Sequence, residues 1–139
     1  MVTRTLRRGR ERGAAAVEFA LVMPALVLLI FGSIEFGLAV NARTMVGNAA
    51  REGVRLASLG QSEASIKAAA LNAVDGVTGT KTVTVTCATP GGASCTIGAP
   101  NAGNVATVTV SVQYTGITGM FPMLTDTTIS ASSYMRIES

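Results

Sequence analysis

Residues 13–40 of this chain read G-A-A-A-V-E-F-A-L-V-M-P-A-L-V-L-L-I-F-G-S-I-E-F-G-L-A-V, and this stretch decides the fold. From Phe19 to Ile34 it carries no charge, and such a run makes about 24 Å of α-helix at about 1.5 Å per residue. Small and apolar residues on both sides extend it to the roughly 20 residues that a bilayer core of about 30 Å requires. No polar stripe marks a solvated face. We therefore predict that residues 14–40 span a membrane as a helix.

Two carboxylates, Glu18 and Glu35, stand near the two ends of the apolar run. An ionised carboxylate near the middle of a bilayer costs at least about 2.5 kcal/mol, so such residues are rare and usually functional. Glu35 can lie at the far interface at modest cost, and its role stays open. Glu18 follows an arginine-rich leader, Gly13 and four small or apolar residues, and we assign a function to this carboxylate.

The positive charge of the chain is confined to its start. Residues 1–13 carry five Arg and one Glu, a net charge of +4, whereas the remaining residues carry six basic and seven acidic side chains, a net charge of −1. Basic residues beside an apolar helix are retained in the cytoplasm, which predicts the N-terminus inside and the C-terminus outside the inner membrane. The basic pI thus belongs to this leader, and no nucleic-acid partner is predicted.

The side chains that most catalytic and metal sites need are scarce. The chain contains no His and two Cys, Cys87 and Cys95, in the part predicted to be outside. Because disulfides persist there and the Pro90-Gly91-Gly92 turn lets the chain reverse between them, we predict a Cys87–Cys95 disulfide. Without His or an activated-serine motif we predict no enzyme, catalytic residue, cofactor, metal or small-molecule substrate.

Beyond the apolar run the pattern predicts a small domain over residues 61–139. The first helix continues as an amphipathic segment over residues 41–60, with Gly60 as its C-terminal cap. Ser62 can cap a second helix that ends near Gly76. The composition then switches to alternating Thr and Val at Lys81–Cys87 and Val105–Tyr114, with a weaker third segment at Thr127–Ile137.

Turn residues separate these three segments, which predicts a small antiparallel sheet of three to four strands. Because the helices come first and the strands follow, the fold class is α+β, with a long N-terminal transmembrane helix. The valines of the strands need a second layer, so part of the long helix is expected to pack on one face of the sheet. The alternation does not determine the strand order.

The junction between leader and helix resembles the prepilin processing motif. Gly13 is followed by four small or apolar residues, then by Glu18 and Phe19, and the whole segment from Arg12 to Gly32 is similar to the TadE-like family of minor pseudopilins. The A-A-R-E-G-V-R sequence at residues 49–55 is similar to that family as well. The resemblance covers about residues 12–60, and nothing after residue 60 carries it.

The resemblance implies a role in biogenesis of the Tad/Flp type IV pilus. Residues 1–13 would be a cytoplasmic leader that a prepilin peptidase removes by cutting between Gly13 and Ala14. Glu18 and Phe19 would serve assembly, and the partners would be other pilins or pseudopilins and the Tad assembly platform. Entry into an extracellular pilus after processing stays open.

One other class of protein explains the same anchor. A permanently membrane-anchored binding or sensor module would also carry a basic leader, an apolar helix and a small external domain. The register of Gly13 and Glu18 separates the two interpretations, since a permanent anchor needs neither residue.

Overall fold

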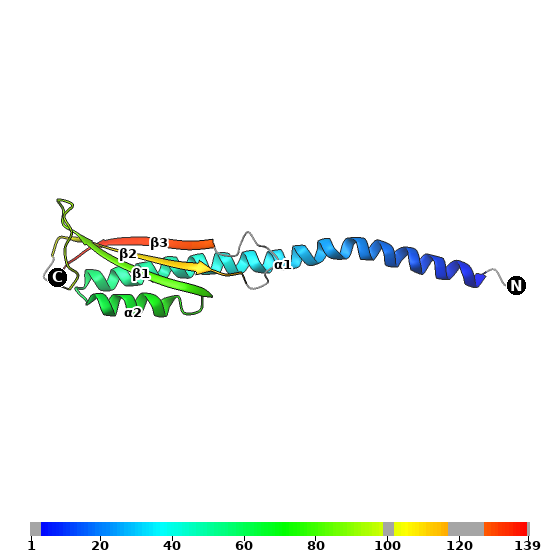
Figure 1. Cartoon of the computed structure of the whole chain (residues 1–139), viewed down its shortest axis with the longest axis horizontal. Helices are drawn as coiled ribbons and strands as arrows, with labels where there is room; N and C mark the ends of the chain where they lie inside the picture. Colours follow the sequence, from blue (N-terminus) through cyan, green and yellow to red (C-terminus); the bar gives the residue numbers. More distant parts are fainter. Residues whose placement is uncertain (1–3, 99–101, 117–126, 139) are drawn as a thin grey trace. The chain divides into compact units, whose positions relative to one another are not determined.

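The computed structural model describes residues 4–98, 102–116 and 127–138 (Figure 1). Helix α1 runs over Arg4–Ser58 and helix α2 over Glu63–Ala73. Strands β1, β2 and β3 follow at Gly79–Ala88, Val105–Tyr114 and Thr127–Arg136. The chain falls into two compact units, residues 1–36 and 37–139, and α1 contributes to both. The α+β class, the long apolar helix, the short second helix and the three-stranded antiparallel sheet are as predicted.

Helix α1 begins earlier than the sequence analysis placed it. We expected the helix from Ala14, whereas the structure starts it at Arg4 and carries it through Gly9, Gly13 and Pro24. The residues of the leader include several Arg, a strong helix former, and contain no Pro, so little opposes helical extension there. The bond between Gly13 and Ala14 consequently lies inside a helix.

The end of α1 and the start of α2 follow the predicted caps. Gly60 has a φ of 70°, and the amides of Gly60 and Gln61 donate to the carbonyls of Ala57 and Leu56 at 3.1 and 3.2 Å. This pair of bonds is the Schellman motif, in which glycine accepts a conformation that strains other residues. The hydroxyl of Ser62 then accepts a bond from the amide of Ser65 at 3.3 Å and caps α2.

The three strands form one sheet in the order β1-β2-β3, with both pairs antiparallel. The pairing places Val83 opposite Val110 and Val110 opposite Ala131, so the apolar positions of neighbouring strands share one face. Position 79 accepts glycine alone, because its φ is 124° and a Cβ there would lie 1.8 Å from the carbonyl oxygen of Gln113.

The core lies between this sheet and the second half of α1. Alternate residues of β2 are buried, and the helix contributes buried small and branched side chains from Ala42 onwards. A Cβ on Gly53 would meet both Val108 of β2 and Ala70 of α2, so three elements converge at this glycine. The prediction that α1 covers one face of the sheet is confirmed. The core residues are Ala42, Val46, Ala49, Ala50, Val54, Ala57, Ile66, Ala70, Val74, Val77, Cys87, Ala106, Val108, Val110, Val112, Tyr114 and Ile137.

The opposite face of the sheet is made largely of hydroxyl side chains. In the row that crosses the middle of the sheet, Thr84 pairs with Thr109 and Thr109 with Ser132, and the hydroxyls of Thr109 and Ser132 lie 2.8 Å apart. Side chains of a strand alternate between faces, so each Thr of the Thr/Val alternation turns toward solvent while the Val turns inward.

A disulfide closes the loop after β1, as predicted. Cys87 and Cys95 are bonded, with their Cα atoms 5.0 Å apart. Between them the amide of Gly92 donates to the carbonyl of Thr89 at 2.9 Å, which makes the turn at Pro90, and the amide of Cys95 donates to the carbonyl of Cys87 at 3.1 Å. The loop is therefore a tight hairpin even apart from its covalent bond.

Replacing both Cys87 and Cys95 with Ala is expected to destabilise the unit formed by residues 37–139 by about 2–3 kcal/mol, because the unfolded chain regains the freedom that a short cross-link removes. Urea unfolding of the full chain in detergent micelles measures this change. Mild reductant should shift the wild-type curve by a similar amount and leave the double variant unchanged. Equal midpoints for the wild type and the double variant would contradict the prediction.

Candidate membrane anchor and processing segment

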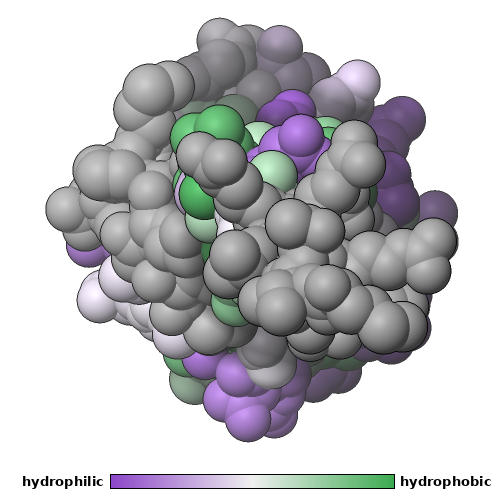
Figure 2. Space-filling view, turned by 90° about the vertical axis from the view of Figure 1, so that its right-hand side faces the viewer, coloured by the Kyte–Doolittle hydropathy of each residue, from purple (hydrophilic) through white to green (hydrophobic). Residues whose placement is uncertain are grey.

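The first half of α1 presents large apolar side chains to its surroundings. Phe19 is 66% exposed and Leu21 is 76% exposed, and most of the run to Val40 is open in the same way. In the face that Figure 2 presents, hydrophobic residues are visible beside hydrophilic ones. Burying one such side chain is worth about 1.5–3 kcal/mol, so a series of them left in water would be very unfavourable.

Among the described residues, α1 is long and apolar enough to cross a membrane, and the apolar part lies near the N-terminus. The same apolar part is not buried within the protein, which distinguishes it from the core helix of a soluble domain. The helix therefore suggests a membrane anchor. The orientation of the anchor and the identity of the membrane stay predictions.

The residues of the predicted processing motif all lie on α1 and all are exposed: Gly13, Ala14, Glu18 and Phe19. A Cβ on Gly13 would meet nothing within 4 Å, so no packing reason requires glycine there. Ala14 and Glu18 are four residues apart in a continuous helix, which puts them one turn apart on the same side. The structure thus places the motif on an accessible helical surface and leaves the roles of its residues as predictions.

The side chain of Glu35 is buried. The sequence allowed this carboxylate to lie at the far membrane interface, yet its side chain is only 1% exposed, whereas the adjacent Ile34 and Phe36 are open. Hydropathy gives no signal for such burial, because it describes composition along the chain and not what encloses a given side chain. The burial of the Glu35 side chain was therefore not predicted from the sequence.

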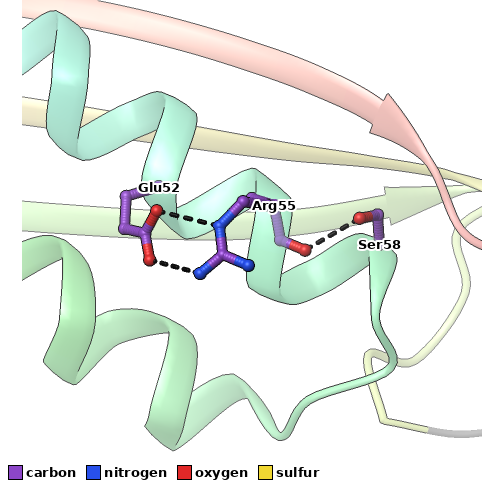
Figure 3. Close-up of polar contacts among 3 residues, drawn as sticks. All are labelled: Glu52, Arg55 and Ser58. Atoms are coloured by element: carbon purple, nitrogen blue, oxygen red, sulfur yellow. Dashed lines mark hydrogen bonds and ion pairs between the residues drawn. The ribbon is translucent and has the colours of Figure 1, made fainter.

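Beyond the apolar segment, α1 carries a charged pair on its exposed side. Nη2 and Nε of Arg55 donate to the two carboxylate oxygens of Glu52 at 2.7 and 3.0 Å, and the hydroxyl of Ser58 donates to the carbonyl of Arg55 at 2.8 Å (Figure 3). The hydrogen bond from the guanidinium lowers the pKa of Glu52 and raises the pKa of Arg55. Glu52 therefore stays ionised into more acidic solution than an isolated Glu does.

The described part of the chain holds no group of three or more His, Cys, Asp or Glu side chains that could bind a metal ion. The charged residues instead form short-range pairs along the helices, such as Lys67 with Glu63 on α2 at 2.6 Å.

Comparison with known protein families finds a match to the model described as TadE-like protein, over residues 13–55. The comparisons with curated proteins and with solved structures give no significant match. The matched residues begin at Gly13 and end at Arg55, so they include the predicted processing motif, the apolar run and the helical continuation. Residues 13–55 of this chain are therefore similar to the TadE-like family.

Proposed function

We propose that this chain is a minor pilin-like protein of Tad/Flp pilus biogenesis, made as a membrane-anchored precursor and cut between Gly13 and Ala14 by a prepilin peptidase. The observation that carries this proposal is the register of Gly13 and Glu18 at the start of an exposed apolar helix. Its helix anchors the precursor in the inner membrane, with the leader inside and residues 41–139 outside. After processing, the same apolar surface packs against other pilins or pseudopilins.

The helical setting of Gly13 gives this glycine a specific part in processing. Proteases bind their substrates as extended chains, so the peptidase must unwind α1 around residues 13 and 14. Glycine in a helix interior is about 0.5–1 kcal/mol less favourable than Ala, which lowers the cost of that unwinding. Its lack of a side chain also lets the backbone enter a narrow active site.

The mass of the mature protein tests the proposal. In cells that possess the peptidase, the wild-type chain is expected to lose its 13 leader residues and to begin at Ala14. Gly13→Leu should accumulate as full-length precursor in the membrane, because its side chain blocks the site and stabilises the helix. Gly9→Leu, a matched change within the same leader, should be processed like the wild type.

An intact N-terminus on the wild-type protein in such cells would favour the permanently anchored binding or sensor module instead. The Tad assembly platform and neighbouring pilins would then not be its partners. The anchor itself would be unaffected by that outcome, because it depends on the apolar run and not on Gly13.

A further inference from the structure

The side of the sheet formed by β3 is left open by the helices. Helix α2 contacts β1, at the other edge of the sheet (Figure 1). Between α1 and β3 lies an open groove of about 540 Å³, lined on the helix side by Asn48, Arg51, Glu52, Val54 and Arg55 and on the strand side by Ser132, Ser133, Tyr134 and Met135. The groove therefore runs beside an edge strand.

Strand β3 carries few of the features that protect exposed edges, since its single charged residue is Arg136 at its last position. Among the described strands it pairs with β2 alone, and its ten residues match β2 without a bulge. It contains neither Pro nor Lys, and Tyr134 and Met135 are 79% and 42% exposed. By contrast β1 carries Lys81, whose ammonium donates to the carbonyl of Asp75 at 3.1 Å. A long, regular edge that the other described residues leave mostly unpaired is a template for another strand.

The charges of the groove select the strand that fits it. Arg55 is held by both oxygens of Glu52, whereas Arg51 donates a longer bond of 3.5 Å to the amide oxygen of Asn48. Two arginines and one glutamate line the groove, so it carries a net charge of +1. Because Glu52 pairs with Arg55, this net charge lies on the guanidinium of Arg51. A carboxylate is the natural complement of that guanidinium.

We propose that an extended acidic segment of a partner polypeptide adds to β3 as a fourth strand. Its backbone pairs with the outer edge of β3, and its side chains alternate between the two faces. Those on the helix side enter the groove and present carboxylates to Arg51, while those on the other side continue the hydroxyl face of the sheet. This interaction goes beyond the function proposed above and does not require processing at Gly13.

A second copy of the chain is a poorer occupant of this edge. Two β3 strands joined edge to edge would bring two basic grooves to the same junction, and like charges would then oppose each other. An acidic segment from a different protein has no such conflict.

Binding of designed peptides to the full chain in neutral detergent micelles tests the proposal. The probe is the labelled nonapeptide T-E-T-E-T-E-T-E-T, in which every carboxylate lies on one face of a strand. Its controls are T-T-E-E-T-T-E-E-T, with the same charge but no such face, and T-K-T-K-T-K-T-K-T. Fluorescence anisotropy gives the affinity, and amide hydrogen exchange of β3 reports strand pairing.

We expect the alternating acidic peptide to bind best and to slow exchange of β3 amides. Arg51→Glu should weaken its binding about tenfold or more, which corresponds to about 1.4 kcal/mol, whereas Lys67→Glu on α2 should not. Equal binding of both acidic peptides, or binding that leaves β3 exchange unchanged, would overturn strand addition. Self-association that protects β3 without any peptide would assign the edge to a second copy and would also overturn the proposal.

Discussion

Leucine in place of Gly53 is expected to lower the free energy of unfolding of residues 37–139 by about 2–3 kcal/mol, because it overpacks a filled core. A Cβ at this position would already lie 2.9 Å from Cγ1 of Val108 and 3.5 Å from Cβ of Ala70. Val108 and Ala70 are both fully buried, so neither can move aside without disturbing its own neighbours. The larger side chain must therefore separate α1 from β2 and α2.

Gly47 provides the matched control in the same helix. A Cβ at Gly47 would meet nothing within 4 Å, so Gly47→Leu adds a good helix former without a clash. This control is expected to be stabilised by about 0.5–1 kcal/mol. Urea unfolding and exchange of β2 amides measure the change in unfolding free energy for both Gly→Leu variants. Changes of opposite sign at the two positions would locate the close contact at Gly53. Equal effects at the two positions would show that α1 does not approach β2 so closely.

The sequence specified most of the local structure of this unit. Alternation of Thr and Val predicted β2 with its observed bounds and β1 to within two residues at each end, because a half-buried strand has a period of two. Ser62 and Gly60 predicted the junction between the helices, because each satisfies a specific backbone requirement at a helix end. Such signals depend only on residues close together in the chain.

The features that depend on distant residues could not be obtained in this way. The order β1-β2-β3 depends on which strands pair. The alternation of Thr and Val within one strand carries no information about which strand lies beside it. The buried residues of α1 include Ala50 and Val54, since the sheet and α2 both pack against this helix. Burial of Glu35 and the groove beside β3 likewise arise only from the folded arrangement.

Helix α1 therefore joins two segments whose side chains must pack against different surroundings. From residue 41 onwards its small residues, such as Ala49 and Gly53, allow close packing against the sheet. Before residue 40 its large residues are open and require an apolar environment supplied from outside the chain. Under the proposed function, this helix anchors the precursor and later packs in a filament, because a membrane and a bundle of pilin helices both satisfy that second requirement.

Substitution of Glu18 by glutamine is expected to abolish pilus assembly while leaving synthesis, insertion and processing largely intact. Under the proposed function, cleavage after Gly13 creates an α-amino group on Ala14, and the carboxylate of Glu18 pairs with that group on a neighbouring subunit. An unpaired carboxylate within the membrane costs at least about 2.5 kcal/mol, so subunits in register are favoured over slipped ones. Glutamine has nearly the same shape but gives no charge with which to discriminate.

The helix geometry also allows Glu18 to pair with the new amino group of its own chain, and the experiment must distinguish this pair from one between subunits. Ala14 and Glu18 of one chain are one turn apart, so the new amine can also meet its own carboxylate. Such a pair within one chain would stabilise the end of the helix but would not set the register between subunits. Pilus number then separates the two roles, because only a pair between subunits couples Glu18 to assembly.

Pili counted by electron microscopy, together with the mass of the mature chain, give the result for Glu18→Gln. A preference of about 2.5 kcal/mol for the subunit in register corresponds to a factor of roughly 70 in an equilibrium, and its loss at each subunit addition leaves few or no filaments. Glu63→Gln, which removes an exposed carboxylate from α2, should leave pilus number unchanged. If processed Glu18→Gln protein supports normal pili, the carboxylate lies at the headgroup level and the assembly role proposed for Glu18 is wrong.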